Sequence, residues 1–336
     1  MSFDEPLERR LLRKLSEVAI TTLSLGGRAL LPLGDHRARG IERVGDLAYG
    51  PHPVAHRVDI YRPSFAHNLP VALYIHGGGF RMLSKETHWP FALEFAERGY
   101  LVFVINYRLA PRHPFPAALE DVARAYAWVL ENAARFGGDP SNLIVSGESA
   151  GANLTMALGL MTAKRFDTVY ARRSFELDRV PDLLLPFAGI HQVSDSARIW
   201  RGRRDFPEYL KNTILSVEHA YLRGELSDEE LPLANPLLFF ESDESLERPF
   251  PPVFLSVGTR DPLLEDHRRL AHALQSRGVE VEAPIYPGGI HAFQAAPITK
   301  LGQAHWRDVD RFLEARRSAE PLAQPAAQSA SKRKRG

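Results

Sequence analysis

Residues 145–152 read VSGESAGA, and a single serine, Ser149, stands there between two glycines. The apolar residues 143–145 precede this stretch and a segment rich in Ala, Leu and Met follows it, which predicts a strand, a tight turn and a helix. A turn of this kind strains the backbone of the serine and exposes its hydroxyl above the carboxyl end of the strand. Glycines suit the flanking positions because side chains there would collide with the neighbouring strand and helix. The pattern also fits a turn in which the glycines serve packing alone. Residues elsewhere in the sequence must therefore show whether Ser149 is catalytic.

Continuous apolar runs recur along the chain and predict strands that are buried on both faces. They are Val71–Ile75, Leu101–Ile105, Leu143–Val145, Leu183–Leu185, Val253–Val257 and Val279–Tyr286, and the alternating stretch Val54–Tyr61 adds a half-exposed strand. Helical patterns fall between these runs, at Trp89–Arg98, Ala117–Phe136, Ser149–Lys164, His267–Ser276 and Trp306–Arg316. Strands and helices in alternation predict an open α/β sheet with helices on both faces.

The composition limits the chemistry that is available. The 336 residues carry a formal net charge of +1, so no global electrostatic field attracts nucleic acid or an anionic membrane. The chain has no cysteine, which excludes disulfides, thiolate nucleophiles and zinc sites with cysteine ligands. Acidic residues interrupt the N-terminal segment and no apolar run reaches the roughly 18–20 residues that span a bilayer, so we expect a cytoplasmic protein without membrane insertion. The basic run Lys332–Arg335 is interpreted as part of a solvated tail rather than as a nucleic-acid site.

Two further residues complete a set that would activate Ser149. A serine hydroxyl is a poor nucleophile until a base takes its proton and an acid orients that base. Asp261 follows the run Val253–Val257, and His291 lies in a glycine-rich loop after the run that ends at Tyr286. Both therefore stand where parallel strands end, the edge of an open α/β sheet at which catalytic groups gather. The order Ser, Asp, His predicts nucleophile, orienting acid and general base, and activity is expected to fall near pH 6–7 as the histidine becomes protonated.

The sequence also offers donors for a developing negative charge. His76-Gly77-Gly78-Gly79 follows directly after the run Val71–Ile75. Three glycines leave the backbone free to aim consecutive N–H groups into a pocket, as attack on an ester carbonyl requires. A phosphate-binding loop is the other interpretation, but the glycines match neither G-x-x-x-x-G-K-[ST] nor a G-x-G-x-x-G that opens a helix. His76 is expected to hold this loop by hydrogen bonding rather than to act as the base.

Together these stretches resemble the hormone-sensitive-lipase-like family of α/β hydrolases, the esterases with an HGGG loop. The matching segments, in the family's order, are HGGGF (76–80), NYRLAP (106–111), HPFPAALED (113–121), GESAGANL (147–154), GTRDPLLED (258–266) and GIHAF (289–293). The resemblance implies the α/β-hydrolase fold, with a central sheet of about eight mostly parallel strands, flanking helices and a helical cap. It also implies a catalytic triad of Ser149, Asp261 and His291, and an oxyanion hole formed by the N–H groups of Gly78, Gly79 and Ala150.

Residues around these motifs are assigned supporting roles. Glu148 stands where the family often has Asp and, like His76 and Gly77, is expected to support the loop rather than to react. The alternative acids Glu265 and Asp266 continue into a helix and are expected to point away from His291. Aromatic candidates for the substrate pocket are Phe80 and Trp89 on the loop side and Phe187, Trp200, Phe206 and Tyr209 on the cap side.

Two regions interrupt the alternation of strands and helices. The resemblance implies a cap made of residues 1–50 and of an insertion at 188–235, over a catalytic core formed by 51–187 and 236–318. A cap of this kind would exclude water and select the substrate. Residues 319–336 are poor in large apolar residues and are predicted to be disordered.

The predicted function is hydrolysis of small carboxylic esters with short to medium acyl chains through an acyl-enzyme, without a metal or an organic cofactor. An amide, carbamate or lactone is an alternative substrate because these share the same acyl chemistry. A catalytically silent binding protein on this fold is a third hypothesis. Such a protein is expected to lack a member of the triad or of the donor loop, whereas this chain has all of them. A strand edge left free at the end of the sheet would allow a homodimer.

Overall fold

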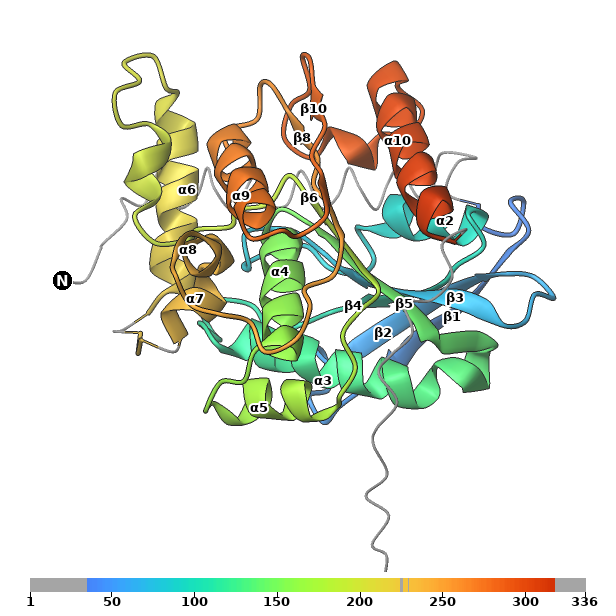
Figure 1. Ribbon diagram of the computed structural model, residues 1–336. Coiled ribbons are helices and arrows are strands. Elements are labelled where there is room, and N and C mark those ends of the chain that lie inside the picture. Colours follow the sequence, from blue (N-terminus) through green and yellow to red (C-terminus); the bar gives the residue numbers. More distant parts are fainter. Residues whose placement is uncertain (1–34, 224–225, 229, 318–336) are drawn as a thin grey trace, which may run out of the picture.

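An eight-stranded sheet forms the centre of the computed structural model, which describes residues 35–223, 226–228 and 230–317 (Figure 1). The strands lie in the order β1-β2-β4-β3-β5-β6-β7-β9. Their bounds are β1 Ile41–Ala48, β2 Arg57–Pro63, β3 Leu69–Ile75, β4 Leu101–Ile105, β5 Gly138–Glu148, β6 Leu183–Phe187, β7 Val253–Phe254 and β9 Val281–Glu282. β2 is antiparallel to β1 and β4, and the other neighbours are parallel. The mostly parallel sheet predicted from the sequence is confirmed.

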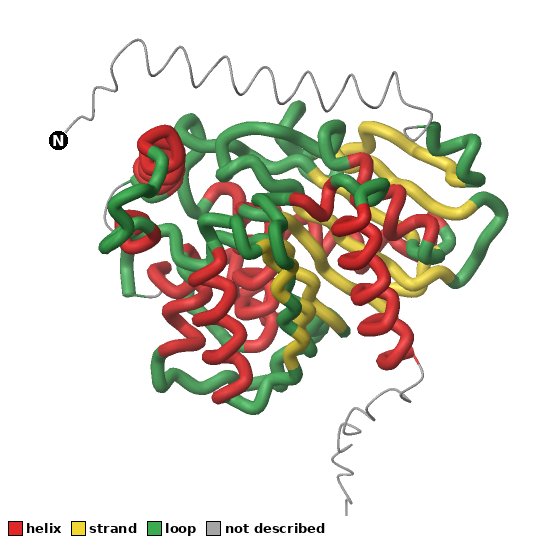
Figure 2. The backbone as a smooth tube through the Cα atoms, turned by 90° about the horizontal axis from the view of Figure 1, so that it is seen from above, coloured by secondary structure: helices red, strands yellow, loops and turns green. Residues whose placement is uncertain are grey.

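Helices cover both faces of this sheet, as Figure 2 shows from above. Along β3, Val71, Leu73 and Ile75 join one hydrophobic cluster, whereas Ala72 and Tyr74 join the other. α3, α4, α5 and α9 contribute to the first cluster, and α2 and α10 to the second. The bounds are α2 Trp89–Glu97, α3 Ala117–Asn132, α4 Ala150–Ala163, α5 Val169–Glu176, α9 Leu264–Ser276 and α10 Lys300–Arg317. Burial on both faces explains why the strands read as continuous apolar runs.

The last strands are shorter and more numerous than the sequence indicates. The run Val253–Val257 divides into β7 and β8 (Val257–Gly258), and the run Val279–Tyr286 divides into β9 and β10 (Ile285–Tyr286). β8 and β10 pair with each other in parallel and form a separate two-stranded sheet. Both of these strands point toward the end of the sheet at which β5 ends, so the loops after them approach the serine turn.

The first strand corrects one prediction. Residues 41–48, which we assigned to the cap with the rest of 1–50, form β1 and pair with β2. The register of this pair shifts between Val44 and Leu47, where Asp46 has a left-handed φ of 62°. Such an irregularity interrupts the alternation of apolar and polar residues by which a strand is recognised in a sequence.

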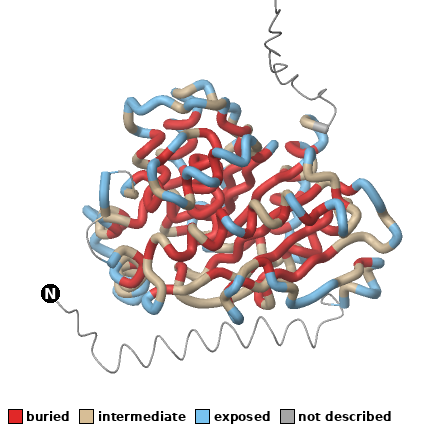
Figure 3. The backbone as a smooth tube through the Cα atoms, turned by 90° about the horizontal axis from the view of Figure 1, so that it is seen from below, coloured by how far each residue is buried: buried red, intermediate tan, exposed pale blue. Residues whose placement is uncertain are grey.

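The segment between β6 and β7 carries further short helices, which gather at one end of the molecule beside α4 and α9 (Figure 1). They are η3 Ser196–Ile199, α6 Glu208–Tyr221, α7 Glu230–Ala234 and α8 Pro236–Glu241. The predicted insertion 188–235 falls within this segment. Figure 3 shows that buried backbone runs through the sheet and the flanking helices, while exposed residues gather on the peripheral loops.

Two predictions fall on parts of the chain outside the described residues. The first is the N-terminal part of the cap, of which residues 1–34 are not described. The second is the tail 319–336. Within the described ranges, every helix is too short or too polar to cross a lipid bilayer.

Candidate active site

Ser149 occupies a strained turn between β5 and α4. Its backbone has φ 55° and ψ −113°, a combination that L-residues rarely adopt. A Cβ on Gly151 would overlap the carbonyl oxygen of Ile75, and a Cβ on Gly147 would overlap the backbone of Gly151. The two glycines are therefore required by the close approach of β3, β5 and α4. The N–H of Ser149 donates to the carbonyl oxygen of Phe187 at 2.9 Å, which ties the turn to β6.

His291 and Asp261 lie beside this serine in a continuous line of polar contacts. Nε2 of His291 is 3.0 Å from Oγ of Ser149, and Nδ1 of His291 is 2.9 Å from Oδ2 of Asp261. The other carboxylate oxygen of Asp261 accepts the N–H of Leu263 at 2.9 Å. Asp261 follows β8 and His291 follows β10, and these strands are parallel neighbours. Their pairing explains how residues 30 positions apart meet.

A second carboxylate faces the same histidine. Oε1 of Glu148 lies 3.6 Å from Nε2 of His291. Burial lowers the pKa of His291, but the charge of Asp261, the hydrogen bond to Asp261 and the charge of Glu148 outweigh burial and raise the pKa to about 9. This value is above the pH 6–7 that we expected from the sequence. The sequence pattern does not reveal that Glu148 and His291, 143 positions apart by number, face each other.

His88 is a member of the site that sequence reasoning missed. Its Nε2 accepts the N–H of Gly77 at 3.1 Å and lies 3.3 Å from Oε2 of Glu148. Since Nε2 accepts a hydrogen bond, the ring proton is assigned to Nδ1, which donates to the carbonyl oxygen of Ser84 at 3.1 Å. The only sequence signal for this residue is its place just before the predicted helix that starts at Trp89.

His76 takes no part in the line of contacts to Ser149. Its ring stacks on Tyr107 with 4.2 Å between ring centroids, and its Nδ1–H donates to the carbonyl oxygen of Gly77 at 2.6 Å. Burial, with a smaller contribution from His88, lowers the pKa of His76 to about 3. The ring is therefore neutral, and its contacts are those of a residue that holds the loop.

The loop after β3 presents free backbone donors. Gly78 and Gly79 have left-handed φ values of 108° and 58°. The carbonyl oxygen of Gly78 turns back and accepts the N–H groups of Arg81 at 3.0 Å and Met82 at 3.1 Å. No described residue accepts a hydrogen bond from the N–H of Gly78, Gly79 or Ala150. Backbone N–H groups without an acceptor in the protein are what an oxyanion hole requires.

The aromatic residues proposed for the pocket need correction. Phe80 and Phe187 are both 0% exposed, and each belongs to the hydrophobic core. Phe80 stacks on Tyr221, and Phe187 packs edge-on against Trp306. Trp89 is partly buried against the second cluster. Sequence proximity to a motif does not distinguish a residue that points into the core from one that lines a pocket, because both are apolar.

The remaining aromatic candidates lie in the insertion. Trp200 and Phe206 pack against each other with 5.9 Å between ring centroids, and Tyr209 is 69% exposed. No contact places these three beside Ser149 within the described residues, and their role in the pocket stays a prediction.

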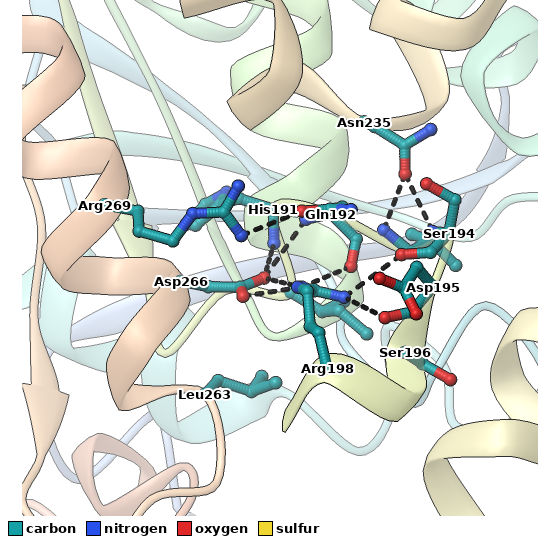
Figure 4. Close-up of polar contacts among 12 residues, drawn as sticks. His191, Gln192, Ser194, Asp195, Ser196, Arg198, Asn235, Leu263, Asp266 and Arg269 are labelled. Carbon is teal, nitrogen blue, oxygen red and sulfur yellow. Dashed lines mark hydrogen bonds and ion pairs between the residues drawn. The ribbon is translucent and has the colours of Figure 1, made fainter. Parts of the chain in front are cut away.

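The two alternative acids lie away from His291. Glu265 is exposed, whereas Asp266 is buried in a separate polar cluster, which Figure 4 shows. Oδ2 of Asp266 accepts the N–H groups of His191 at 3.0 Å and Gln192 at 3.1 Å, and its Oδ1 is 2.5 Å from Nη2 of Arg198. The cluster joins the start of the segment after β6 to α9.

Comparison with known proteins identifies the family of this chain. Residues 72–295 match the family described as the alpha/beta hydrolase fold. The chain belongs to this family. The resemblance to its hormone-sensitive-lipase-like esterases, first seen in the motifs, is confirmed.

Several relatives of this α/β hydrolase are named esterases. It is 33% identical over 243 residues to carboxylesterase NlhH of Mycobacterium tuberculosis, with 70% of each chain covered. It is 30% identical over 250 residues to an acetyl esterase of Salmonella schwarzengrund, with 73% of this chain and 72% of that protein covered. The structure of a hyperthermophilic esterase from the archaeon Pyrobaculum calidifontis superposes with a TM-score of 0.71 at 26% identity, covering 94% of this chain and 99% of that one. The predicted enzyme class, a serine hydrolase of the carboxylesterase type, is thereby confirmed.

Proposed function

We propose that this α/β hydrolase cleaves carboxylic esters with short to medium acyl chains through an acyl-enzyme on Ser149. The observation that carries the proposal is the line of contacts from Ser149 through His291 to Asp261, with distances of 3.0 and 2.9 Å. A base within hydrogen-bond distance of the nucleophile, oriented in turn by an acid, is the arrangement that activates a serine.

In the first step, Oγ of Ser149 attacks the ester carbonyl carbon while its proton passes to Nε2 of His291. Asp261 keeps the ring proton on Nδ1 and stabilises the imidazolium that forms. The tetrahedral intermediate then breaks its bond to the alcohol oxygen, which receives the proton from Nε2. Water then attacks the acyl carbon of the acyl-enzyme while its proton passes to Nε2 of His291; the bond between the acyl carbon and Oγ of Ser149 breaks, Oγ takes the proton from Nε2, and the carboxylic acid is released.

Backbone N–H groups would stabilise the oxygen that becomes negative in each half of the reaction. Gly78, Gly79 and Ala150 are the proposed donors, supported by their N–H groups having no acceptor among the described residues. Ala150 is also the first residue of α4, whose positive dipole end favours negative charge there. Loss of one such donor typically costs about 10²–10³ in rate.

We also propose that the segment 188–235 covers the site and limits the size of the acyl group. This role is supported by the contacts of the segment with the two helices that follow Ser149 and Asp261, through α7 on α4 and through Arg198 on Asp266 of α9. We further propose that the hydrogen bonds among Gly77, His88 and Glu148 support the oxyanion loop from beneath. These three residues would not contact the substrate.

The test is hydrolysis of p-nitrophenyl esters from acetate to palmitate by the wild type and by Ser149→Ala. Serine-dependent turnover that peaks at short or medium chains is expected. A matched control is Ser141→Ala, because Ser141 is an exposed serine on β5 whose hydroxyl donates to Asp139 at 2.6 Å. Turnover that survives Ser149→Ala would refute the assignment of the nucleophile. A folded wild type that is labelled by a fluorophosphonate at Ser149, yet cleaves no ester in the series, would refute the substrate class.

A further inference from the structure

The proposed oxyanion loop is packed against a helix of the segment that follows β6. Three consecutive residues of the loop, Gly79, Phe80 and Arg81, each contact α6. A Cβ added to Gly79 would lie 2.7 Å from Cγ2 of Val217, so the helix approaches the glycine backbone as closely as van der Waals contact allows. Glycines have no side chain with which to anchor themselves, so packing against this helix adds to the hydrogen bonds of the Gly77 N–H and of the Gly78 and Phe80 carbonyl oxygens in fixing the loop.

The contacts of Phe80 and Arg81 with α6 are made by side chains and fix the orientation of the loop relative to the helix. The ring of Phe80 stacks on that of Tyr221 with 3.7 Å between centroids and 9° between planes, and both side chains are 0% exposed. Nη1 of Arg81 donates to Oγ of Ser216 at 2.5 Å. Val217 and Tyr221 are four residues apart and thus lie on the same face of α6. This face of α6 therefore meets the loop that carries the proposed donors, at the backbone of Gly79 and at the ring of Phe80.

α6 is held in place from both of its sides. The carbonyl oxygen of Tyr221 accepts the N–H of Phe115 at 2.8 Å, a bond to the body of the fold. Earlier in the same turn, the carboxylate of Glu218 accepts the N–H groups of Asp195 and Ser196, both at 3.0 Å, at the start of η3. Arg198 in η3 pairs in turn with the buried Asp266 (Figure 4). A helix held by hydrogen bonds at these positions is suited to keep a neighbouring loop in place, and less suited to act as a moving lid.

We infer that α6 positions the oxyanion loop, so that Val217 and Tyr221 act on the chemical step through Gly79 and Phe80. The inference rests on the proposed function, since it takes Gly78 and Gly79 as the donors. Donors must lie about 2.7–3.1 Å from the oxyanion, and a displacement of about 1 Å costs on the order of 10²-fold in rate. The segment after β6 is then a part of the catalytic apparatus and not only a cover for the substrate.

The first test separates kcat from KM for p-nitrophenyl butyrate. Tyr221→Ala and Val217→Ala are expected to lower kcat by roughly tenfold or more with KM changed less than about threefold, because the donors act on the transition state. Tyr221→Phe, which keeps the ring that stacks on Phe80, is expected to restore most of the kcat that Tyr221→Ala loses. His219→Ala, at an exposed position of the same helix, is the control for a general effect of changing α6. A rise in KM with kcat unchanged would overturn the inference, because it would make these residues substrate contacts.

The second test looks for a rescue of kcat rather than for a loss. Gly79→Ala is expected to abolish most of kcat because its Cβ meets Val217 and because φ is 58° at this position. In the double variant Gly79→Ala with Val217→Ala, the space opened on the helix is expected to restore kcat at least fivefold relative to Gly79→Ala alone. If the loss of kcat in the double variant equals the product of the losses in the two single variants, the inference is overturned.

Both tests are run beside Ser149→Ala and fluorophosphonate labelling, with thermal midpoints to show that each variant is folded. If turnover does not depend on Ser149, the proposed function fails. If turnover depends on Ser149 but is indifferent to Val217 and Tyr221, the proposed function stands and the inference about α6 fails.

Discussion

Oε1 of Glu148 lies 3.6 Å from Nε2 of His291, the same nitrogen that faces Oγ of Ser149. The atom proposed to take the proton from Ser149 thus has a carboxylate beside it. A negative charge at this distance favours the imidazolium form. It stabilises the charge that develops on His291 during the reaction, but it also keeps the resting base protonated at a higher pH.

The first prediction concerns the acid limb of the pH profile. The neutral ring is the active base, so kcat/KM rises with pH as His291 loses its proton. The pKa of His291 is raised from 6.5 to about 9, and 38% of its side chain is exposed, so that water screens part of this effect. We expect the limb to lie above pH 7 and at or below about pH 9. A profile of kcat/KM for a pH-insensitive ester between pH 5 and 10 measures it, and a midpoint at or below 6.5 would contradict the prediction.

The second prediction removes the carboxylate beside this ring. Glu148→Gln keeps the shape of the side chain and removes its charge, so the limb of kcat/KM is expected to move to lower pH. Glu265→Gln, an exposed acid on α9 that lies away from His291, is the matched control and is expected to leave the limb in place. A limb that does not move in Glu148→Gln would show that Asp261 alone raises the pKa of His291.

Third, Asp261→Asn is expected to lower kcat by about 10⁴-fold, the loss that accompanies the wrong histidine tautomer in a triad. Asn can still accept the N–H of Leu263, so the loop after β8 is expected to keep its shape. Steady-state kinetics measure the loss of kcat, and the thermal midpoint shows whether the loop and the fold are preserved. A large fall in the thermal midpoint would mean that Asp261 supports the loop more than it orients His291.

Fourth, Gly151→Ala is expected to destabilise the fold by roughly 1–3 kcal/mol, the usual cost of forcing extra atoms into a packed interior. Its Cβ would overlap the carbonyl oxygen of Ile75, a backbone atom that only a shift of β3 can move. Gly99→Ala is the comparison, because it has open space around the new Cβ and pays only for its left-handed φ of 84°. Urea unfolding measures both, and an equal loss at the two positions would contradict the steric argument.

Fifth, Phe187→Ala is expected to cost about 3–5 kcal/mol of unfolding free energy, as for other fully buried aromatic residues. Because its ring packs on Trp306 and Phe91 rather than toward Ser149, the preference for acyl-chain length is expected to stay the same. Denaturant unfolding and the ester series are the measurements. A changed chain-length preference in a stable variant would return Phe187 to the pocket.

Most of the fold could be predicted because the strands are buried on both faces. Their apolar runs are continuous, and the turn at Ser149 stands between one such run and a helix that is buried along all of its 14 residues. The positions of Asp261 and His291 followed from the rule that parallel strands bring their carboxyl ends together. β1 escaped detection because a left-handed residue, Asp46, interrupts its alternation.

The parts of the site that were missed depend on contacts between segments without a sequence signature. His88 reaches Gly77 and Glu148 only because α2 begins beside the loop after β3. Phe80 and Phe187 were assigned to the pocket although they are core residues, since an apolar side chain near a motif fits either place. The place of such a residue along the chain can be read from the sequence. Whether its side chain points into the core or into a pocket depends on tertiary packing.

The proposed nucleophile and its base stand 142 residues apart in the chain. A growing polypeptide that has already formed the turn at Ser149 has no base until residue 291 has been synthesised and the loop after β10 has closed onto the sheet. The unfinished chain is therefore chemically inert toward esters. In a refolding experiment, the return of esterase activity requires this long-range contact, whereas the helical signal requires only contacts that are local in the sequence.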